Sequence, residues 1–91
     1  MTGLKFDSGK TQYHLMPPNA LEEICKVLMF GAAKYSENNW RIVDDANTRY
    51  YNAGMRHLQA WLQGEKLDQE SGLPHLAHAL CCFTFLLELD K

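Results

Sequence analysis

The C-terminal segment constrains the fold most, because its apolar residues fall on nearly every side of a helix. Periodicity predicts a helix from about Leu73, with Pro74 in its first turn, almost to the C-terminus. Its main apolar stripe consists of Leu76, Leu80, Phe83 and Leu87. Its other sides carry Cys82, Phe85, Leu86 and Leu89. Such a helix is normally buried all round, and in one small domain of 91 residues only a second copy of the chain can cover the extra faces.

A first helix is predicted upstream, after Pro17 and Pro18. Asn19 with Glu22 has the form of an N-cap box, in which each side chain satisfies a free backbone amide of the first turn. The pattern then runs to about Lys34. The apolar stripe that we expect to be buried consists of Leu21, Ile24, Cys25 and Leu28.

A second helix is predicted from about Arg49 to Gln63. Gly64 follows it, placed to end the helix in a left-handed conformation. Gly54, in the middle of this helix, costs about 1 kcal/mol relative to alanine unless a close contact uses the missing side chain, so we interpret it as a packing point. The expected buried stripe consists of Tyr51, Met55, Leu58 and Leu62.

The connections complete the expected organisation. Residues 35–48 lose periodicity and gather Asn, Asp and Ser, which is typical of a long polar connection. The acidic loop of residues 65–72 is short, so the last two helices should run antiparallel. We therefore expect one all-α domain over residues 1–91, with three helices and possibly an extra short one, after an ordered arm over residues 1–16.

Composition excludes several classes of protein. The 9 Lys and Arg residues against 11 Asp and Glu give a net charge of -2 without a basic run, which argues against binding to duplex nucleic acid. No stretch approaches the roughly 20 apolar residues of a membrane-spanning helix. The N-terminus MTGLKFDSGK is too polar for a signal peptide, so a cytosolic protein without a membrane partner is expected. The three cysteines, Cys25, Cys81 and Cys82, form no CxxC pair and are interpreted as reduced core residues.

Histidines and carboxylates gather around the acidic loop. His75 and His78 share one face near the start of the last helix, and antiparallel packing brings His57 to a similar height. The loop adds Glu65, Asp68 and Glu70. Oxygen-rich ligation of this kind favours Mg²⁺ or Mn²⁺ over a closed zinc site. The alternative is that the histidines are hydrogen-bonded structural residues and that the loop is simply solvated.

A second set of residues suits a phosphorylated ligand. Lysines bind phosphate as point charges, arginine grips it in a fork, and aromatic rings offer a stacking face for a base. The candidates are Lys5, Asp7, Lys10, Lys34, Tyr35, Asn39, Trp40 and Arg56. The alternative is that they are surface charges and that Trp40 pins the long connection onto the core. Covalent catalysis is not favoured, because Ser71 lacks the strand-turn-helix context of a nucleophilic serine.

Four segments, taken in order, resemble a known family. They are GLKFDSGK, FGAAKYSENNW, YYNAGMRHLQAW and GEKLDQESGLPHLAHALCCFTFLLEL. Together they resemble the phage-associated dATP/dGTP diphosphohydrolase domain, which is related to the all-α MazG-like nucleoside triphosphate pyrophosphohydrolases. The similarity runs from Gly3 to about Leu89.

The resemblance implies a MazG-like subunit of an oligomeric helical bundle, a dimer or tetramer. It implies hydrolysis of a purine deoxynucleoside triphosphate such as dGTP or dATP to the monophosphate and pyrophosphate, with Mg²⁺ or Mn²⁺. It also implies a phage-encoded protein in the cytosol of a bacterial host. The metal ion would neutralise phosphate oxygens and help to generate the attacking water.

One departure from that family affects the site. MazG-like enzymes usually carry ExxE and ExxD pairs on two helices, whereas residues 49–63 contain no acidic residue. We therefore expect Glu65, Asp68 and Glu70 to serve as catalytic and metal-binding carboxylates. The expected imidazole ligands are His57, His75 and His78. Two further hypotheses stay open, a non-catalytic nucleotide-binding phage protein on the same fold and an oligomerising helical module with structural polar clusters.

Overall fold

A computed structural model describes residues 2–90 and shows an all-helical chain. Its helices are α1 (Pro18–Lys34), α2 (Ala46–Leu62) and α3 (His75–Leu89), with short 3-10 helices η1 (Tyr13–Leu15) and η2 (Asn39–Ile42). The described residues form no strand, only an isolated bridge between Leu67 and Pro74, which confirms the all-α prediction. None of the described helices is long and apolar enough to cross a membrane.

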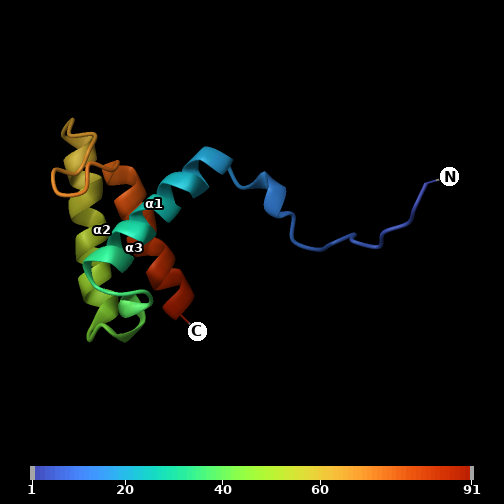
Figure 1. Cartoon of the computed structure of the whole chain (residues 1–91), viewed down its shortest axis with the longest axis horizontal. Coiled ribbons are helices and arrows are strands. Elements are labelled where there is room, and N and C mark those ends of the chain that lie inside the picture. Colours follow the sequence, from blue (N-terminus) through green and yellow to red (C-terminus); the bar gives the residue numbers. More distant parts are fainter. Residues whose placement is uncertain (1, 91) are drawn as a thin grey trace.

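The helices pack as an antiparallel pair with a third helix laid across it. Figure 1 shows α2 and α3 side by side and running in opposite directions, as the short loop between them predicted. α1 crosses this pair and packs on α3. The long connection after α1 returns to α3 through η2.

The starts of the helices differ from the sequence predictions. α1 begins at Pro18 with Pro17 as its N-cap and makes no side-chain cap hydrogen bond, so the predicted cap at Asn19 is wrong. Proline suits the first helical position because it has no backbone N–H to satisfy there and its fixed φ already matches a helix. α2 begins three residues early, at Ala46, after a left-handed Asp45 with φ of 53°. α3 begins at His75, so Pro74 caps the helix instead of lying in its first turn.

The end of α2 and the loop after it are tightly built. Gly64, with φ of 100°, is left-handed as predicted, and its N–H donates to the Trp61 carbonyl at 3.0 Å. The Glu65 N–H donates to the Ala60 carbonyl at 3.0 Å, which completes a Schellman motif. The loop then closes on itself, since the Asp68 N–H donates to the Leu73 carbonyl at 2.8 Å. This backbone fixes the position of the acidic loop relative to both helices.

The core is small, and it lies on a different side of α3 from the one predicted. It consists of Val27, Ala77 and Cys81, with Leu28, Leu73 and Phe85 packed against it. Three of the four residues of the predicted stripe of α3 point outward instead, with Leu76 37%, Leu80 45% and Leu87 76% exposed, whereas the fourth, Phe83, is partly buried against Gly54. Cys25 is also exposed, which corrects its interpretation as a core residue. α3 turns its small side chains and its histidines toward α1 and α2, because small residues allow the helices to approach closely.

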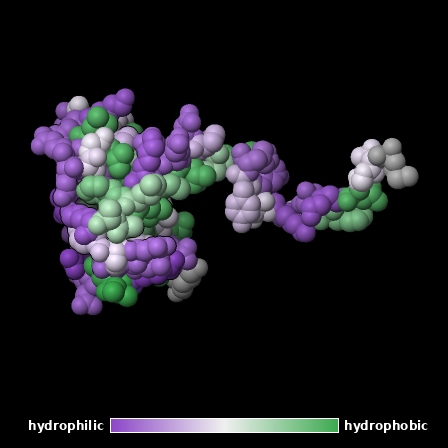
Figure 2. Space-filling model, viewed as in Figure 1, coloured by the Kyte–Doolittle hydropathy of each residue, from purple (hydrophilic) through white to green (hydrophobic). Residues whose placement is uncertain are grey.

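The predicted arm extends away from the helical body. Figure 1 shows it leaving the start of α1, and Figure 2 shows hydrophobic residues along it. Its apolar side chains lie in solvent, with Leu4 and Phe6 both 84% and Tyr13 83% exposed. A left-handed Gly9 and the hydrogen bond from the Lys10 N–H to the Asp7 carbonyl shape a turn in it.

Gly54 on α2 packs directly against Phe83 and Cys82 of α3, which confirms it as a packing point. It is buried, and a Cβ atom at this position would lie 2.7 Å from Cε1 of Phe83 and 3.2 Å from Cβ of Cys82. Distances this short leave no room for a methyl group unless the Phe83 ring or α3 itself shifts. Gly31 in α1, in contrast, has no atom within 4 Å of such a Cβ.

We expect Gly54→Ala to destabilise the chain although alanine is the better helix former. Overpacking against Phe83 should outweigh the gain in helix propensity and lower the free energy of unfolding by about 1–2 kcal/mol. Gly31→Ala is the matched control, and its open surroundings should make it neutral or slightly stabilising. Urea unfolding followed by circular dichroism measures both. Equal stability of the two variants would contradict close packing at Gly54.

Candidate functional site

Three histidines meet where α2 and α3 lie closest to the acidic loop. His57 comes from α2, and His75 and His78 come from the first turn of α3. The two Nδ1 atoms of His57 and His75 are 2.8 Å apart. The rings of His57 and His78 stack with their centroids 4.5 Å apart and their planes at 11°. The expected meeting of these histidines is thus present in the structure.

Glu65 orients the imidazole of His75. Its Oε1 lies 2.7 Å from Nε2 of His75, which is buried. An ionised carboxylate only accepts hydrogen bonds, so His75 donates through Nε2–H, and in the neutral ring Nδ1 keeps its lone pair. That lone pair then accepts from Nδ1–H of His57. A carboxylate that fixes the far nitrogen of a histidine is the usual arrangement behind a metal-binding imidazole.

Asp68 lies beside this pair and is held ionised. Single ligand atoms of His57, Asp68 and His75 all lie within 4.8 Å of one another, close enough to hold one metal ion. Burial is the largest single effect and acts to raise the pKa of Asp68, but the hydrogen bonds from Ser71 together with the nearby His78 and His57 leave that pKa below its usual value. One of these bonds runs from the Ser71 N–H to Oδ2 of Asp68 at 2.9 Å.

His78 was expected to be a metal ligand, but its hydrogen-bond partner is a serine. Its Nε2 lies 2.7 Å from Oγ of Ser71, which in turn accepts a hydrogen bond from the Leu73 N–H at 3.1 Å. Asp68 is more distant, with Oδ2 at 3.9 Å from the same nitrogen. His78 therefore lies outside the group of three donor atoms, and its ring supports His57 from the side. The sequence analysis considered Ser71 only as a nucleophile and missed this positioning contact.

Glu70 is also engaged elsewhere. Its two carboxylate oxygens accept from Nζ of Lys34 at 2.9 and 3.0 Å. Lys34 ends α1, so this ion pair links that helix to the acidic loop. Glu65, Asp68 and Glu70 were expected to act together as catalytic and metal-binding carboxylates. In the structure only Asp68 among them joins the imidazoles as a possible ligand.

A groove of about 830 Å³ opens beside the histidine cluster. It runs between the C-terminal half of α1, the connection after it, and the facing sides of α2 and α3. His57, Asp68 and His78 line it near the acidic loop. The expected ligand-binding residues of the helical body all line it as well, namely Lys34, Tyr35, Asn39, Trp40 and Arg56.

Trp40 is held from both sides. Phe85 stacks on one face at 4.4 Å between centroids, and the Arg41 guanidinium lies 4.2 Å from the ring centroid. The Tyr50 hydroxyl donates to the Trp40 carbonyl at 3.3 Å. Trp40 thus pins the connection onto α3, as its structural interpretation predicted, and a base could stack on it only by displacing Arg41. Tyr35, 64% exposed, lines the groove with an accessible ring.

Sequence reasoning missed several residues of the groove. Arg49, Asn52 and Tyr50 line it from α2. Arg49 lies seven residues before Arg56, so the two cations fall on one face of the helix. That spacing was the available signal. Phe85 was assigned to an outer side of its helix, yet it lines the groove and stacks on Trp40.

The arm residues expected to bind phosphate do not reach the groove. Lys5, Asp7 and Lys10 are exposed and do not line it. The arm leaves the body at the start of α1, whereas the groove lies at the other end of that helix (Figure 1).

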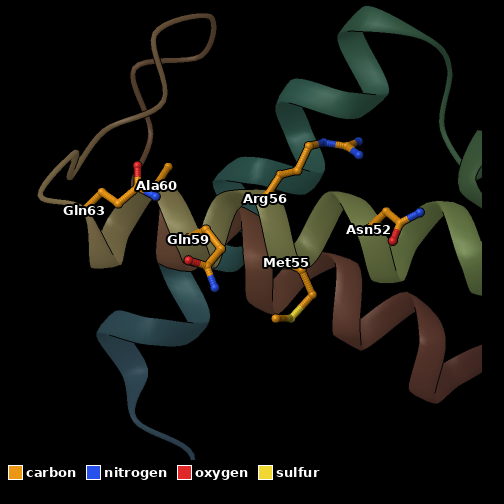
Figure 3. Close-up of a pocket in the computed structure, with 6 residues that line it drawn as sticks. All are labelled: Asn52, Met55, Arg56, Gln59, Ala60 and Gln63. Atoms are coloured by element: carbon orange, nitrogen blue, oxygen red, sulfur yellow. The ribbon is translucent and has the colours of Figure 1, made fainter.

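A second hollow lies on α2 alone. It measures about 420 Å³ and is lined by Asn52, Met55, Arg56, Gln59, Ala60 and Gln63 (Figure 3). Because all of its lining comes from one helix, it has no opposite wall to enclose a ligand. Figure 3 shows Arg56 leaving the helix toward the ribbon of α1 while Met55 points the other way. Arg56 lines both hollows, and only the larger groove places it together with Lys34 and the histidines.

The two cysteines of α3 do not suit nucleophilic chemistry. Burial raises the pKa of Cys81 to about 12 and that of Cys82 to about 11. Thiols with such values stay protonated at neutral pH and are poor nucleophiles.

Comparison with known proteins gives the chain a family. Residues 1–91 match the family model described as dATP/dGTP diphosphohydrolase, N-terminal. A protein of Salmonella phage PMBT28 named dATP/dGTP diphosphohydrolase is 37% identical over 89 residues. The alignment covers 98% of this chain but only 30% of that relative, so the chain spans less than a third of its length. No solved structure matches.

The half-buried His57 and His78 make the folded chain sensitive to acid. Burial lowers the pKa of both His57 and His78, with the neighbouring imidazoles adding to the effect. The unfolded chain therefore takes up protons at a higher pH than the folded chain does. Their contribution to the free energy of unfolding is complete above the ordinary histidine pKa of about 6.5. It is lost as the pH falls toward the lowered pKa values of the folded state.

We therefore expect the melting temperature, measured in EDTA, to be constant above about pH 7 and to fall below about pH 6.5. His57→Gln should flatten this dependence, because it removes one of the two groups. His14→Gln, in the exposed arm, is the control and should keep the wild-type profile. Identical profiles for His57→Gln and wild type would contradict the assignment.

Proposed function

The chain belongs to the family of dATP/dGTP diphosphohydrolase N-terminal domains, and on that premise we propose that it carries the site at which a purine deoxynucleoside triphosphate is cleaved to the monophosphate and pyrophosphate. The observation that carries the proposal is the groove of about 830 Å³, which combines His57 and Asp68 with cations and aromatic rings. The printed name of the phage relative supports the substrate class. Its phage origin supports action on the nucleotide pool in the cytosol of a bacterial host.

The groove has the length and order of groups that a nucleotide needs. His57 lies seven residues after Tyr50 on α2, and Phe85 lies seven residues after His78 on α3. Seven residues of helix correspond to about 10 Å. The proposed phosphate end is therefore formed by the histidine cluster, and the proposed base end lies two turns away beside Tyr50 and Phe85. Arg56 and Lys34 provide positive charge along the same groove.

The three gathered donors suit a divalent transition-metal ion. Two imidazoles and one carboxylate match Mn²⁺ better than Mg²⁺, which prefers oxygen ligands. Mg²⁺ is usually held by one or two carboxylates together with substrate phosphates, so Asp68 alone could receive it with the nucleotide. His57, Asp68 and His75 would hold the ion, and Glu65 would orient His75. When bound, such an ion neutralises phosphate oxygens and lowers the pKa of water.

The side chains of the groove then have separate roles. Water adds to the α-phosphorus, the bond from that phosphorus to the oxygen bridging to the β-phosphorus breaks, and one proton is released. The ionised Asp68 carboxylate orients the water and accepts its proton, because it can only accept hydrogen bonds. Arg56 and Lys34 stabilise the negative charge on the departing pyrophosphate. The Lys5, Asp7 and Lys10 side chains have no assigned role within one copy of the chain.

Direct product analysis tests this function. The protein is incubated with each deoxynucleoside and ribonucleoside triphosphate in Mn²⁺, Mg²⁺ or EDTA, and anion-exchange chromatography separates the products. We expect dGTP or dATP to yield the monophosphate and pyrophosphate, and EDTA to abolish the reaction. Asp68→Asn should lower the rate at least about 100-fold, the usual effect of losing a positioned base. His14→Gln is the control.

A nucleotide that binds but stays intact would contradict hydrolysis and support the non-catalytic binding protein. A chain that neither binds nor cleaves nucleotides would contradict both functions. Thermal stabilisation by added nucleotide separates these two outcomes, because only a ligand of the folded state raises its melting temperature.

We also propose that the partner that covers the exposed apolar surface is a second copy of the chain. None of the described large side chains is fully buried, so one copy has a very small core. Leu80 and Leu87 lie on one exposed side of α3, and α3 is the most apolar helix. A surface patch of this kind is typical of an interface between subunits.

Sedimentation velocity tests the self-association. We expect a dimer or tetramer, and the double variant Leu80→Glu and Leu87→Glu should weaken the association at least about tenfold, because each introduced carboxylate would be buried without a partner. Circular dichroism confirms that the variant remains helical. A wild-type chain that stays monomeric at every concentration would overturn this part of the proposal.

A further inference from the structure

One ion pair in the groove joins Lys34, to which the proposed function assigns a role in binding phosphate, to Glu70 of the acidic loop. Nζ of Lys34 donates to both oxygens of Glu70, at 3.0 and 2.9 Å. The two residues are 36 positions apart in the sequence, so the contact is tertiary and joins the end of α1 to the acidic loop. Both residues line the groove, so the ion pair forms part of the wall that a ligand would contact.

The other lysine-glutamate pair of α1 provides a comparison. Nζ of Lys26 lies 3.1 Å from Oε1 of Glu23, three residues away on the same helix. That local pair follows from helical spacing alone and lies outside the groove. The Lys34–Glu70 pair has no such local cause. Its hydrogen bond to Glu70 raises the pKa of Lys34, so the amine stays fully charged.

Glu70 presents to Lys34 the same chemistry as a phosphate group. Two anionic oxygens accept hydrogen bonds from one ammonium group, which is how lysine binds phosphate as a point charge. We propose that Glu70 is a built-in competitor that occupies the phosphate-binding ammonium group of Lys34 in the free protein and is displaced by the phosphates of the incoming nucleotide. This inference rests on the proposed function, because it assigns an additional residue to the same groove.

The exposure of the ion pair explains why phosphate can replace Glu70 at Lys34, and the position of Glu70 in the acidic loop explains why this replacement affects the site. The side chains of Lys34 and Glu70 are 39% and 60% exposed, and exposed ion pairs are weak. A polyphosphate carries more negative charge than one carboxylate and should replace it. Displacement also releases the acidic loop from α1, and this loop carries Asp68. Occupation of Lys34 by phosphate is thereby coupled to the loop that holds a proposed metal ligand.

The test measures binding of a nucleotide that the enzyme cannot cleave. α,β-Methylene-dATP and α,β-methylene-dGTP are titrated into the full chain in Mn²⁺ by isothermal calorimetry. We expect Glu70→Gln to bind the analogue about threefold more tightly than wild type, because the amide keeps the size but no longer competes as an anion. Lys34→Met should bind it more weakly. In the Lys34→Met background, Glu70→Gln should have no further effect on analogue binding, since the ammonium group for which Glu70 competes is gone.

Two controls separate this role from others. Glu23→Gln removes the carboxylate of the local pair and should leave nucleotide affinity unchanged. Mn²⁺ is also titrated alone, and Glu70→Gln should keep the wild-type affinity for the ion.

Unchanged or weaker analogue binding by Glu70→Gln would overturn the competitor role, as would a loss of Mn²⁺ affinity, which would identify Glu70 as a metal ligand. If wild type binds the analogue and only these effects are missing, the competitor role alone fails. If neither wild type nor any variant binds a nucleotide, the proposed function fails and the competitor role fails with it.

Discussion

The rest of the structure depends on the close contact between α2 and α3 at Gly54. A missing side chain at this position lets the ring of Phe83 approach to a distance that no Cβ atom would tolerate. His57 lies one turn further along α2, so the same close approach brings its Nδ1 to 2.8 Å from that of His75. A wider spacing of the two helices would separate the imidazoles. The close packing of α2 on α3 and the meeting of the two imidazoles thus depend on one contact.

Hydrogen-bond partners divide the site into a rigid cluster and a more weakly held rim. Glu65 fixes His75, and Ser71 fixes both Asp68 and His78, all through contacts of 2.9 Å or less within the loop and the start of α3. His75, Asp68, Ser71 and His78 are buried or half-buried, where a hydrogen bond is strong and an unsatisfied polar group is costly, and Glu65, 46% exposed, contacts the cluster from its outer side. The Lys34–Glu70 pair lies at the exposed rim, where such contacts are weak. Substrate-dependent change is therefore expected at the rim, beside a rigid cluster.

The shortness of the chain explains both the small core and the exposed apolar residues. A short chain has few residues for a core, and Val27, Leu28, Cys81 and Phe85 belong to the core region and also line the groove of about 830 Å³. α3 serves the groove with one side, through His78 and Phe85, and turns its larger aliphatic residues outward. This division of α3 explains why a helix with apolar residues all round is only partly covered by its own chain.

The sequence by itself determined the three helices, the left-handed end of α2 at Gly64, the antiparallel pairing, and the meeting of His57 with His75. Each follows from local backbone preference, helical spacing or loop length, which act over few residues. The tertiary structure alone decided which side of α3 is buried. It also decided that Glu70 pairs with Lys34 and that Ser71 contacts His78. Trp40 likewise packs between Phe85 and Arg41 only because the fold brings them together. Carboxylates two or three residues apart in one loop look equivalent in a sequence. Their partners depend on distances of a few ångströms between groups far apart in the chain, and only the packed helices set those distances.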